Sequence, residues 1–466
     1  MYECPNCGGN LKFDIPSQQL ACAYCNAEFD PYSISKEKDA EEDNSYEVTV
    51  FTCPQCGGEI YSMDNTAAGF CSFCGASTIL DSRLKRQQSP GFIIPFKKTK
   101  TDCKKAYAKT MKYAIFAPKE LKDEKHIDSF RGIYMPYWIF DLKQQGDIVM
   151  HGKKEKRRGD YIIISHYNLH AYLDAYYKGL SYDASSSFAD NISERIAPFD
   201  VKKLRKFVPS YLSGFYADTS DVESRVYKED AIDTAVRGTK GFVKKRSEMK
   251  PYELEDDDRA LKSIFGTETE GVDAAMFPVW FLSYRNKDRV AYATVNGQTG
   301  KVVADLPVDI KKYMTGSLLL AIPIFFLLNM IFTVKPTSLL ITVSIISFIC
   351  IILHLIEMNE IKVKENYEDD KGALEALRRN HGNRTNRAGE TKGKKGIPGS
   401  LWSVLAIVLS VLIIIVNPVS DLYYYGGAIL SLGAVFLTLL DLIKKYNVLA
   451  TRRLPQFDYQ GGDDRA

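Results

Sequence analysis

Positive charge is scarce in the first 80 residues of this 466-residue chain. Lys12, Lys36 and Lys38 stand there against twelve acidic side chains, and arginine is absent. Affinity for nucleic acid comes largely from basic side chains that neutralise phosphates, so this composition argues against nucleic-acid binding by the N-terminal region. The extreme N-terminus also lacks the apolar segment of a cleavable secretory signal, and no such signal is expected.

Charged side chains are absent from four long stretches in the last third of the chain. A helix of about 20 residues, rising 1.5 Å per residue, is long enough to cross a hydrocarbon core of roughly 30 Å. The sequence therefore predicts an α-helical, four-span membrane region. The predicted spans are residues 316–334, 337–356, 397–416 and 422–443, the last including a charged end. No buried charged pair is expected inside any span, which argues against a transporter or channel.

The distribution of lysine and arginine predicts the orientation of these spans. The loops at 335–336 and 417–421 hold one basic residue between them, whereas the loop at 357–396 holds ten. Since basic loops stay on the cytoplasmic side, both termini, the basic loop and the tail at 444–466 are expected in the cytoplasm. The sequence therefore predicts a multi-pass protein of an inner, cytoplasmic membrane.

Eight of the ten cysteines form one pattern that occurs twice. Each unit has two Cys-x-x-Cys pairs with fourteen residues between them, and the second unit follows the first at an offset of 49 residues. The candidate metal ligands are Cys4, Cys7, Cys22 and Cys25 in the first unit and Cys53, Cys56, Cys71 and Cys74 in the second. The remaining Cys103 and Cys350 are expected to be small buried apolar residues.

The chemistry of this pattern points to two zinc ribbons. A Cys-x-x-Cys turn places two thiolates on one side of a tight knuckle, and two facing knuckles complete a tetrahedron around zinc. A unit of about 25 residues needs such a metal to fold, so we expect two structural Zn²⁺ ions. Iron in the same cage stays an alternative. A thioredoxin-like redox pair is disfavoured, and so is a catalytic metal, because thiolates fill all four positions.

The domain boundaries follow from these motifs and from composition. Ribbon 1 is predicted at 1–30, a charged linker at 31–50, ribbon 2 at 51–82 and an α+β domain with an antiparallel sheet at 91–310. In that domain, residues 101–116 have helical spacing, residues 167–175 alternate as a half-buried strand, and residues 296–300 form a hairpin turn. Two strands share a Pro-x-Trp core around Trp138 and Trp280, whose indoles we expect in the core.

Several motifs in the middle domain are similar to known functional sites. "GQTGK" lacks the spacing and the following helix of a phosphate-binding loop. His166 and His170 share a strand face but have no evident third ligand. The basic run of Lys153, Lys154, Lys156, Arg157 and Arg158 predicts a solvated hairpin tip, with anionic lipid as a possible contact.

Longer blocks of the chain resemble a known family. They include "CPNCGG", "IIPFKKTKTDCKKAYAKTMK", "HIDSFRGIYMPYWIFDL", "IAPFDVKKLRKFVPSYLSGFYADTSDVE", "FPVWFL" and "VNGQTGKVVADLPVD". Together they resemble the bacterial TFIIB-type zinc-ribbon-containing membrane proteins, over most of residues 50–315. The resemblance implies no established reaction. Its PriA-like helicase label is not supported here, because a Walker-type loop is absent, and the second ribbon departs from the usual pattern.

These observations predict a membrane-anchored interaction or adaptor module rather than an enzyme. The acidic ribbons, to which each zinc tetrathiolate adds negative charge, favour a protein partner with a basic surface. The main alternative is a membrane-tethered nucleic-acid-associated factor that uses the basic middle domain. A weaker alternative is an enzyme whose site carries no recognised motif.

Overall fold

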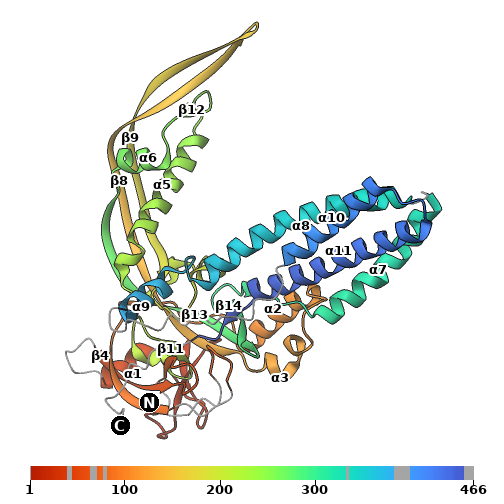
Figure 1. Cartoon of the computed structure of the whole chain (residues 1–466). Coiled ribbons are helices and arrows are strands. Elements are labelled where there is room, and N and C mark those ends of the chain that lie inside the picture. The colour runs from red at the N-terminus through yellow and green to blue at the C-terminus, as the bar shows by residue number, and fades with distance from the viewer. Residues whose placement is uncertain are drawn as a thin grey trace.

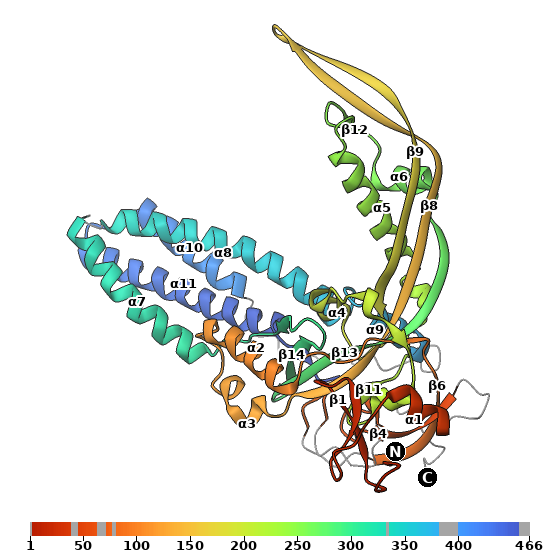
Figure 2. The same cartoon turned by 180° about the vertical axis from the view of Figure 1, so that it is seen from behind.

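The structure is a computed structural model that describes residues 2–38, 45–62, 71–76, 81–331, 335–381 and 399–455. Within these residues the chain forms a three-stranded sheet, a thirteen-stranded sheet and several long helices. A base built around the sheets carries two projections, a bundle of helices and a long β-hairpin, which leave it in different directions (Figures 1 and 2).

The small sheet belongs to the first cysteine unit. Its antiparallel strands are β1 (Leu11–Asp14), β2 (Gln19–Cys22) and β3 (Glu28–Phe29). The region predicted as a charged linker then forms helix α1 (Pro31–Lys38) and most of strand β4 (Ser45–Thr52). Because β4 pairs with β5 (Glu59–Ser62) and β6 (Asp81–Gln88), the second cysteine unit joins the large sheet.

The centre of the large sheet is the antiparallel pair β8 (Arg131–Arg158) and β13 (Glu268–Asn286). Met135 lies opposite Phe277, so equivalent positions of the two Pro-x-Trp motifs face each other across a local two-fold axis. The indole Nε1–H of Trp138 donates to the carbonyl of Val222, and that of Trp280 to the carbonyl of Lys98, each at 2.8 Å. Both tryptophans therefore tie the sheet to neighbouring chain segments.

The remaining strands complete an α+β domain whose sheet is mainly antiparallel, as predicted. Only β11–β8 and β13–β7 pair in parallel among the described strands. The strands are β7 (Phe92–Ile93), β9 (Tyr161–Asp183), β10 (Arg205–Lys206), β11 (Tyr216–Asp218), β12 (Glu253–Leu254), β14 (Arg289–Asn296), β15 (Val302–Ala304) and β16 (Arg452–Arg453). The predicted turn at 296–300 joins β14 to β15, and the Gly300 N–H donates to the Asn296 carbonyl at 2.8 Å.

Helix α2 (Lys100–Tyr113) begins where the sequence predicts a helix and ends three residues earlier than predicted. Thr99 and Asp102 form a reciprocal capping box, in which each side chain accepts a hydrogen bond from the other's backbone N–H. The other helices on or near the domain are α3 (Glu124–Ile127), α4 (Asp190–Ile196), α5 (Lys228–Lys245), α6 (Asp258–Phe265) and α9 (Lys371–His381).

Strands β8 and β9 form the projecting hairpin, and the predicted strand at 167–175 is the middle of β9. Helices α5 and α6 lie along it and cover one of its faces over part of its length (Figure 1). The buried contacts there are Ile148, Met150, Val236, Leu261 and Phe265. Strand β12 pairs with Gly152 and Lys153, so this support ends near Lys153.

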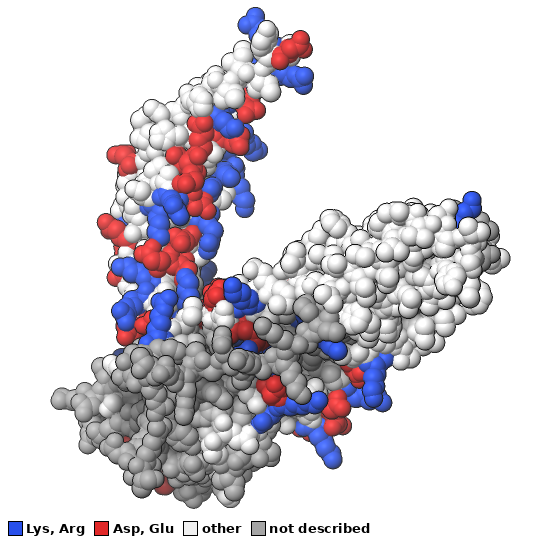
Figure 3. All heavy atoms as spheres, viewed as in Figure 1, with Lys and Arg blue, Asp and Glu red and all other residues white. Residues whose placement is uncertain are grey.

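The last third of the chain forms α7 (Ile310–Ile331), α8 (Pro336–Glu365), α10 (Gly399–Val416) and α11 (Asp421–Leu449). Three of them, over Ile310–Leu328, Thr337–Glu365 and Leu422–Leu449, are long and apolar enough to cross a membrane. Helix α10 is apolar but shorter and packs against α8 and α11, so length supports three of the four predicted spans. The visible bundle surface carries almost no charged side chains (Figure 3).

Arg289 on β14 joins the domain to the helices. Its guanidinium donates to the Val448 carbonyl at 2.8 Å, to Thr451 Oγ1 at 2.7 Å and to Glu365 at 2.9 Å. The first residues of the tail predicted at 444–466 complete α11 and form β16, which pairs with β14. The loop predicted at 357–396 begins within α8 and continues into α9. Its residues 382–396 lie outside the described part of the chain.

Two candidate metal centres

Each cysteine knuckle turns at the residue that follows its second cysteine. Gly8, Asn26, Gly57 and Gly75 occupy these four positions, and all have φ between 56° and 72°. Glycine adopts this left-handed conformation without strain, and asparagine tolerates it better than most residues. In the first knuckle the Gly8 N–H donates to the Cys4 carbonyl at 2.9 Å, which closes the turn and brings the Cys4 and Cys7 thiols to one side.

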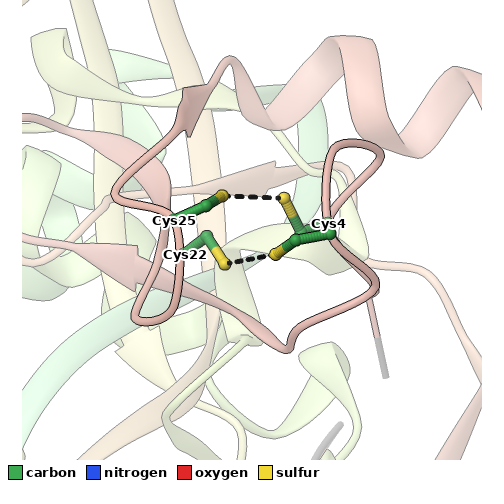
Figure 4. A group of neighbouring side chains, drawn as sticks. Cys4, Cys22 and Cys25 are labelled. Carbon is green, nitrogen blue, oxygen red and sulfur yellow. Dashed lines mark hydrogen bonds between the residues drawn. The ribbon is translucent and has the colours of Figure 1, made fainter.

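The first centre consists of Cys4, Cys7, Cys22 and Cys25, whose Sγ atoms all lie within 4.8 Å of one another. The Sγ atoms of Cys4 and Cys25 are 3.5 Å apart, as are those of Cys7 and Cys22 (Figure 4). Tetrahedral Zn–S bonds of about 2.3 Å place sulfur atoms about 3.8 Å apart. The four thiols therefore fit one tetrahedral metal ion.

The second centre consists of Cys53, Cys56, Cys71 and Cys74 and meets the same 4.8 Å limit. The Sγ atoms of Cys53 and Cys74 are 3.8 Å apart, and those of Cys56 and Cys71 are 3.7 Å apart. The structure thus brings together the two sets of thiols that the cysteine spacing predicts, and each set can hold one metal ion.

Backbone groups in the first centre favour the thiolate form that a metal requires. Hydrogen bonds from the backbone N–H groups of Cys25 and Tyr24 lower the pKa of Cys22 to about 6. Since a thiolate rather than a thiol is the metal ligand, these two N–H groups favour the form of Cys22 that binds a metal.

The two centres differ in exposure. In the first, Cys7 and Cys25 are exposed at the surface and the ring of Tyr24 beside them is 80% exposed. In the second, all four cysteines are buried and pack in one apolar cluster with Phe51 and Phe73. The two units have the same cysteine spacing in the sequence, but their cysteines differ in burial.

The second centre is held inside the α+β domain by specific contacts. The Tyr292 hydroxyl donates to the Phe73 carbonyl at 2.6 Å, and the Arg285 guanidinium donates to Gln55 Oε1 at 2.6 Å. A Cβ atom at Gly75 would lie 3.1 Å from the Arg285 Cβ, so the knuckle and β13 are in close contact. The second ribbon is therefore part of the domain core rather than a free docking module.

The first ribbon packs on the domain through the face opposite its exposed knuckles. The Phe13 ring lies 5.2 Å from the ring of Tyr211, and the Phe13 N–H donates to the Ser213 carbonyl at 3.0 Å. The Gln18 amide donates to the Phe96 carbonyl at 2.8 Å. These contacts fix the ribbon on the domain, while Cys7, Tyr24 and Cys25 stay at the surface.

The other candidates from the sequence do not assemble into a metal site. His166 Nδ1 pairs with Glu255 at 2.9 Å, and in the described part of the chain the two cysteine groups are the only clusters of three or more possible metal ligands with suitable spacing. Lys153 forms ion pairs with Glu253 and Glu155 at 3.1 and 3.2 Å. Lys154, Lys156, Arg157 and Arg158 are exposed on the distal part of β8. Cys103 and Cys350 are buried, as expected.

Sequence reasoning missed a polar cluster in the helix bundle. Lys445 Nζ on α11 donates to the Asp441 carboxylate and contacts Nδ1 of His354 on α8, and all three side chains are mostly shielded from solvent. The expectation of no buried charged pair was made for residues 422–443, and Lys445 lies just beyond that span, in a helix that continues to Leu449. The i, i+4 spacing of Asp441 and Lys445 is the signal that could have indicated it.

Comparison with known proteins gives one informative relative. The chain is 27% identical over 325 residues to an uncharacterized protein, YdjG, of Bacillus subtilis (strain 168), and the match covers 66% of this chain and 90% of that protein. No protein-family model matches the chain, and no solved structure matches it.

Proposed function

We propose that this protein is a membrane-anchored adaptor whose first zinc ribbon binds a protein partner on the cytoplasmic face of a bacterial inner membrane. Two Zn²⁺ ions act as structural cofactors, α7, α8, α10 and α11 cross the membrane, and both termini lie in the cytoplasm. The single observation that carries the proposal is the exposure of the first centre beside the burial of the second.

The chemistry of the exposed ribbon favours a partner with a basic surface. Among the side chains that the structure describes around the small sheet, Glu3, Glu28 and Asp30 are exposed, and Lys12 is the one exposed lysine. A Zn²⁺ ion held by four thiolates adds two further negative charges. Tyr24 offers a large aromatic surface with a polar tip, which is typical of residues that contribute strongly to protein interfaces.

The proposal includes no reaction, because both cages direct four thiolates at the metal and leave no position for substrate. The arrangement of the helices supports anchoring. The apolar bundle begins directly after the domain, and Arg289 holds the ends of α8 and α11 against β14. The first ribbon would thus be presented at a fixed place relative to the membrane.

Chemical cross-linking on cells that produce the intact chain tests this proposal. Tyr24→Ala should remove the main cross-linked partner without loss of metal, since an 80% exposed ring contributes little to folding. Tyr113→Ala is the matched control, because Tyr113 is 78% exposed on the α+β domain. An unchanged partner in Tyr24→Ala, or recovery of nucleic acid whose binding falls steeply with salt, would reject the proposal.

A further inference from the structure

The end of the β8–β9 hairpin exposes apolar side chains that nothing in the described structure covers. Tyr161, Ile162, Ile163 and Ile164 are 78%, 64%, 44% and 49% exposed. Successive residues of a strand point to opposite faces, so the isoleucines are uncovered on both faces of the ribbon. Contiguous exposed apolar surface of this kind marks an interaction site in a soluble region of a protein.

Basic side chains lie directly across the ribbon from these apolar ones. Arg158 pairs with Tyr161, Arg157 with Ile162 and Lys156 with Ile163. Residues 153–164 carry five basic and two acidic side chains. At the end of the projection, Lys and Arg spheres stand beside acidic and uncharged ones (Figure 3).

The hairpin tip is a built feature rather than a frayed loop. Gly159 has φ of 63° in a two-residue turn, and the pairing continues without interruption from Arg158–Tyr161 to Leu142–Tyr177. From the buried Phe140 to Arg158 the strand extends about 60 Å. Beyond Lys153 neither β12 nor the helices support it, and an isolated two-stranded ribbon is only marginally stable in water.

We propose that this tip, residues 154–164, inserts into the anionic inner leaflet of the bilayer that holds the protein's own helices. Ile162, Ile163 and Ile164 enter the boundary of the acyl chains, and Tyr161 sits at headgroup level, where tyrosine is enriched. Arg157, Arg158 and Lys156 bind lipid phosphates while their stems lie along apolar surface.

The position of the hairpin supports this bilayer as the partner. The three long apolar helices keep a membrane within reach of the domain. The distal part of the hairpin leans toward the side on which the helix bundle extends (Figures 1 and 2). The hairpin would then be a second membrane contact, far from the helices, that holds the domain at a fixed inclination to the surface.

Tryptophan fluorescence of the full chain in lipid vesicles tests this inference. Ile162→Trp and Ile163→Trp report the two faces of the tip, and Tyr172→Trp is a matched control on the same strand, since Tyr172 is 63% exposed. The wild-type signal, from three native tryptophans, is subtracted. The vesicles contain phosphatidylcholine with or without phosphatidylglycerol, and their lipids have brominated acyl chains. On average, each vesicle contains fewer than one protein molecule.

We expect a blue-shifted emission and at least two-fold quenching at position 162 or 163 in phosphatidylglycerol vesicles, and neither change at position 172. Replacing Lys156, Arg157 and Arg158 by glutamine should reduce this quenching by more than half. Water-exposed, unquenched emission at both tip positions would overturn the inference and leave a protein partner as the occupant. Equal quenching at position 172 would also overturn it. Neither result depends on the ribbon, so the two proposals fail separately.

Discussion

The hydroxyl of Tyr292 donates a 2.6 Å hydrogen bond to the backbone carbonyl of Phe73, between Cys71 and Cys74 of the second metal centre. Tyr292 lies on β14, more than 200 residues further along the chain, and both partners are buried. This contact makes the second centre part of the domain core, whereas the first centre keeps Cys7 and Cys25 at the surface and buries only Cys4 and Cys22. The two metal centres therefore have different consequences when they are disrupted.

Removal of the second centre should destabilise the whole α+β domain. Cys53→Ser with Cys56→Ser removes the buried metal and leaves polar groups in an apolar cluster, which we expect to cost several kcal/mol. Thermal unfolding of the detergent-solubilised protein should shift down by roughly 10 °C or more. Cys7→Ser with Cys25→Ser is the matched pair at exposed positions, and it should lower the unfolding temperature by less than the buried pair does. Equal shifts would contradict the distinction between the centres.

The Tyr292–Phe73 bond can be tested without touching a metal ligand. Tyr292→Phe removes only the hydroxyl and leaves the Phe73 carbonyl without this donor, which should cost about 1–3 kcal/mol. The apparent melting temperature should fall by roughly 2–10 °C with unchanged metal content. Tyr161→Phe, at a 78% exposed site, is the control and should not change it. A variant as stable as the wild type would show that the contact does not hold the ribbon.

The sequence predicts the metal ligands well because both cages are local. Each Cys-x-x-Cys turn is complete within a few residues, and its left-handed position is visible as glycine or asparagine. The difference in burial between the cages is not visible in the same way. It arises from pairing of β5 with β11 and from the contact with Tyr292, which join segments far apart in the chain.

The hairpin shows a second limit of local patterns. Alternation at 167–175 correctly indicates an antiparallel strand, and Leu169 and Leu173 do contact the cluster under α5 and α6. The consecutive isoleucines at 162–164 break that alternation, yet they continue the same strand. The alternation of apolar and polar residues could not show that this strand extends past the helices that support it, because those helices, α5 and α6, come from residues 228–265.

The buried carboxylate of Asp218 predicts a pH dependence of stability. Burial raises the pKa of Asp218 to about 7, although hydrogen bonds from Ser185 and Ser187 oppose the shift. Between about pH 4 and pH 7 the folded state keeps a proton that the unfolded state has lost. The contribution of this group to stability is therefore largest at low pH, falls as pH rises through this window, and is constant above about pH 7.

Asp218→Asn should remove this dependence. Relative to the wild type, the variant should gain roughly 3 kcal/mol between pH 5 and pH 8, because each unit of pKa shift corresponds to about 1.4 kcal/mol. Melting temperatures of both proteins, measured at equal ionic strength with excess zinc, give the difference. The metal centres are common to both proteins and cancel. Parallel pH profiles would show that Asp218 is already ionised in the folded state at pH 5.

The polar cluster between α8 and α11 should stabilise the helix bundle. Lys445→Met leaves the Asp441 carboxylate beside His354 without its cation, and Lys444→Met is the neighbouring exposed control. We expect Lys445→Met, but not Lys444→Met, to unfold at a lower denaturant concentration than the wild type in mixed micelles. The double variant with Asp441→Leu should recover about 1–3 kcal/mol relative to the sum of the single changes. Additive effects would mean that the two charges do not interact.

Metal content of the purified wild-type protein tests the central claim most directly. Two sealed thiolate cages require two zinc ions per chain by elemental analysis, and one ion in the Cys7→Ser, Cys25→Ser variant. Wild-type protein that contains no bound metal, or iron in place of zinc, would contradict the account.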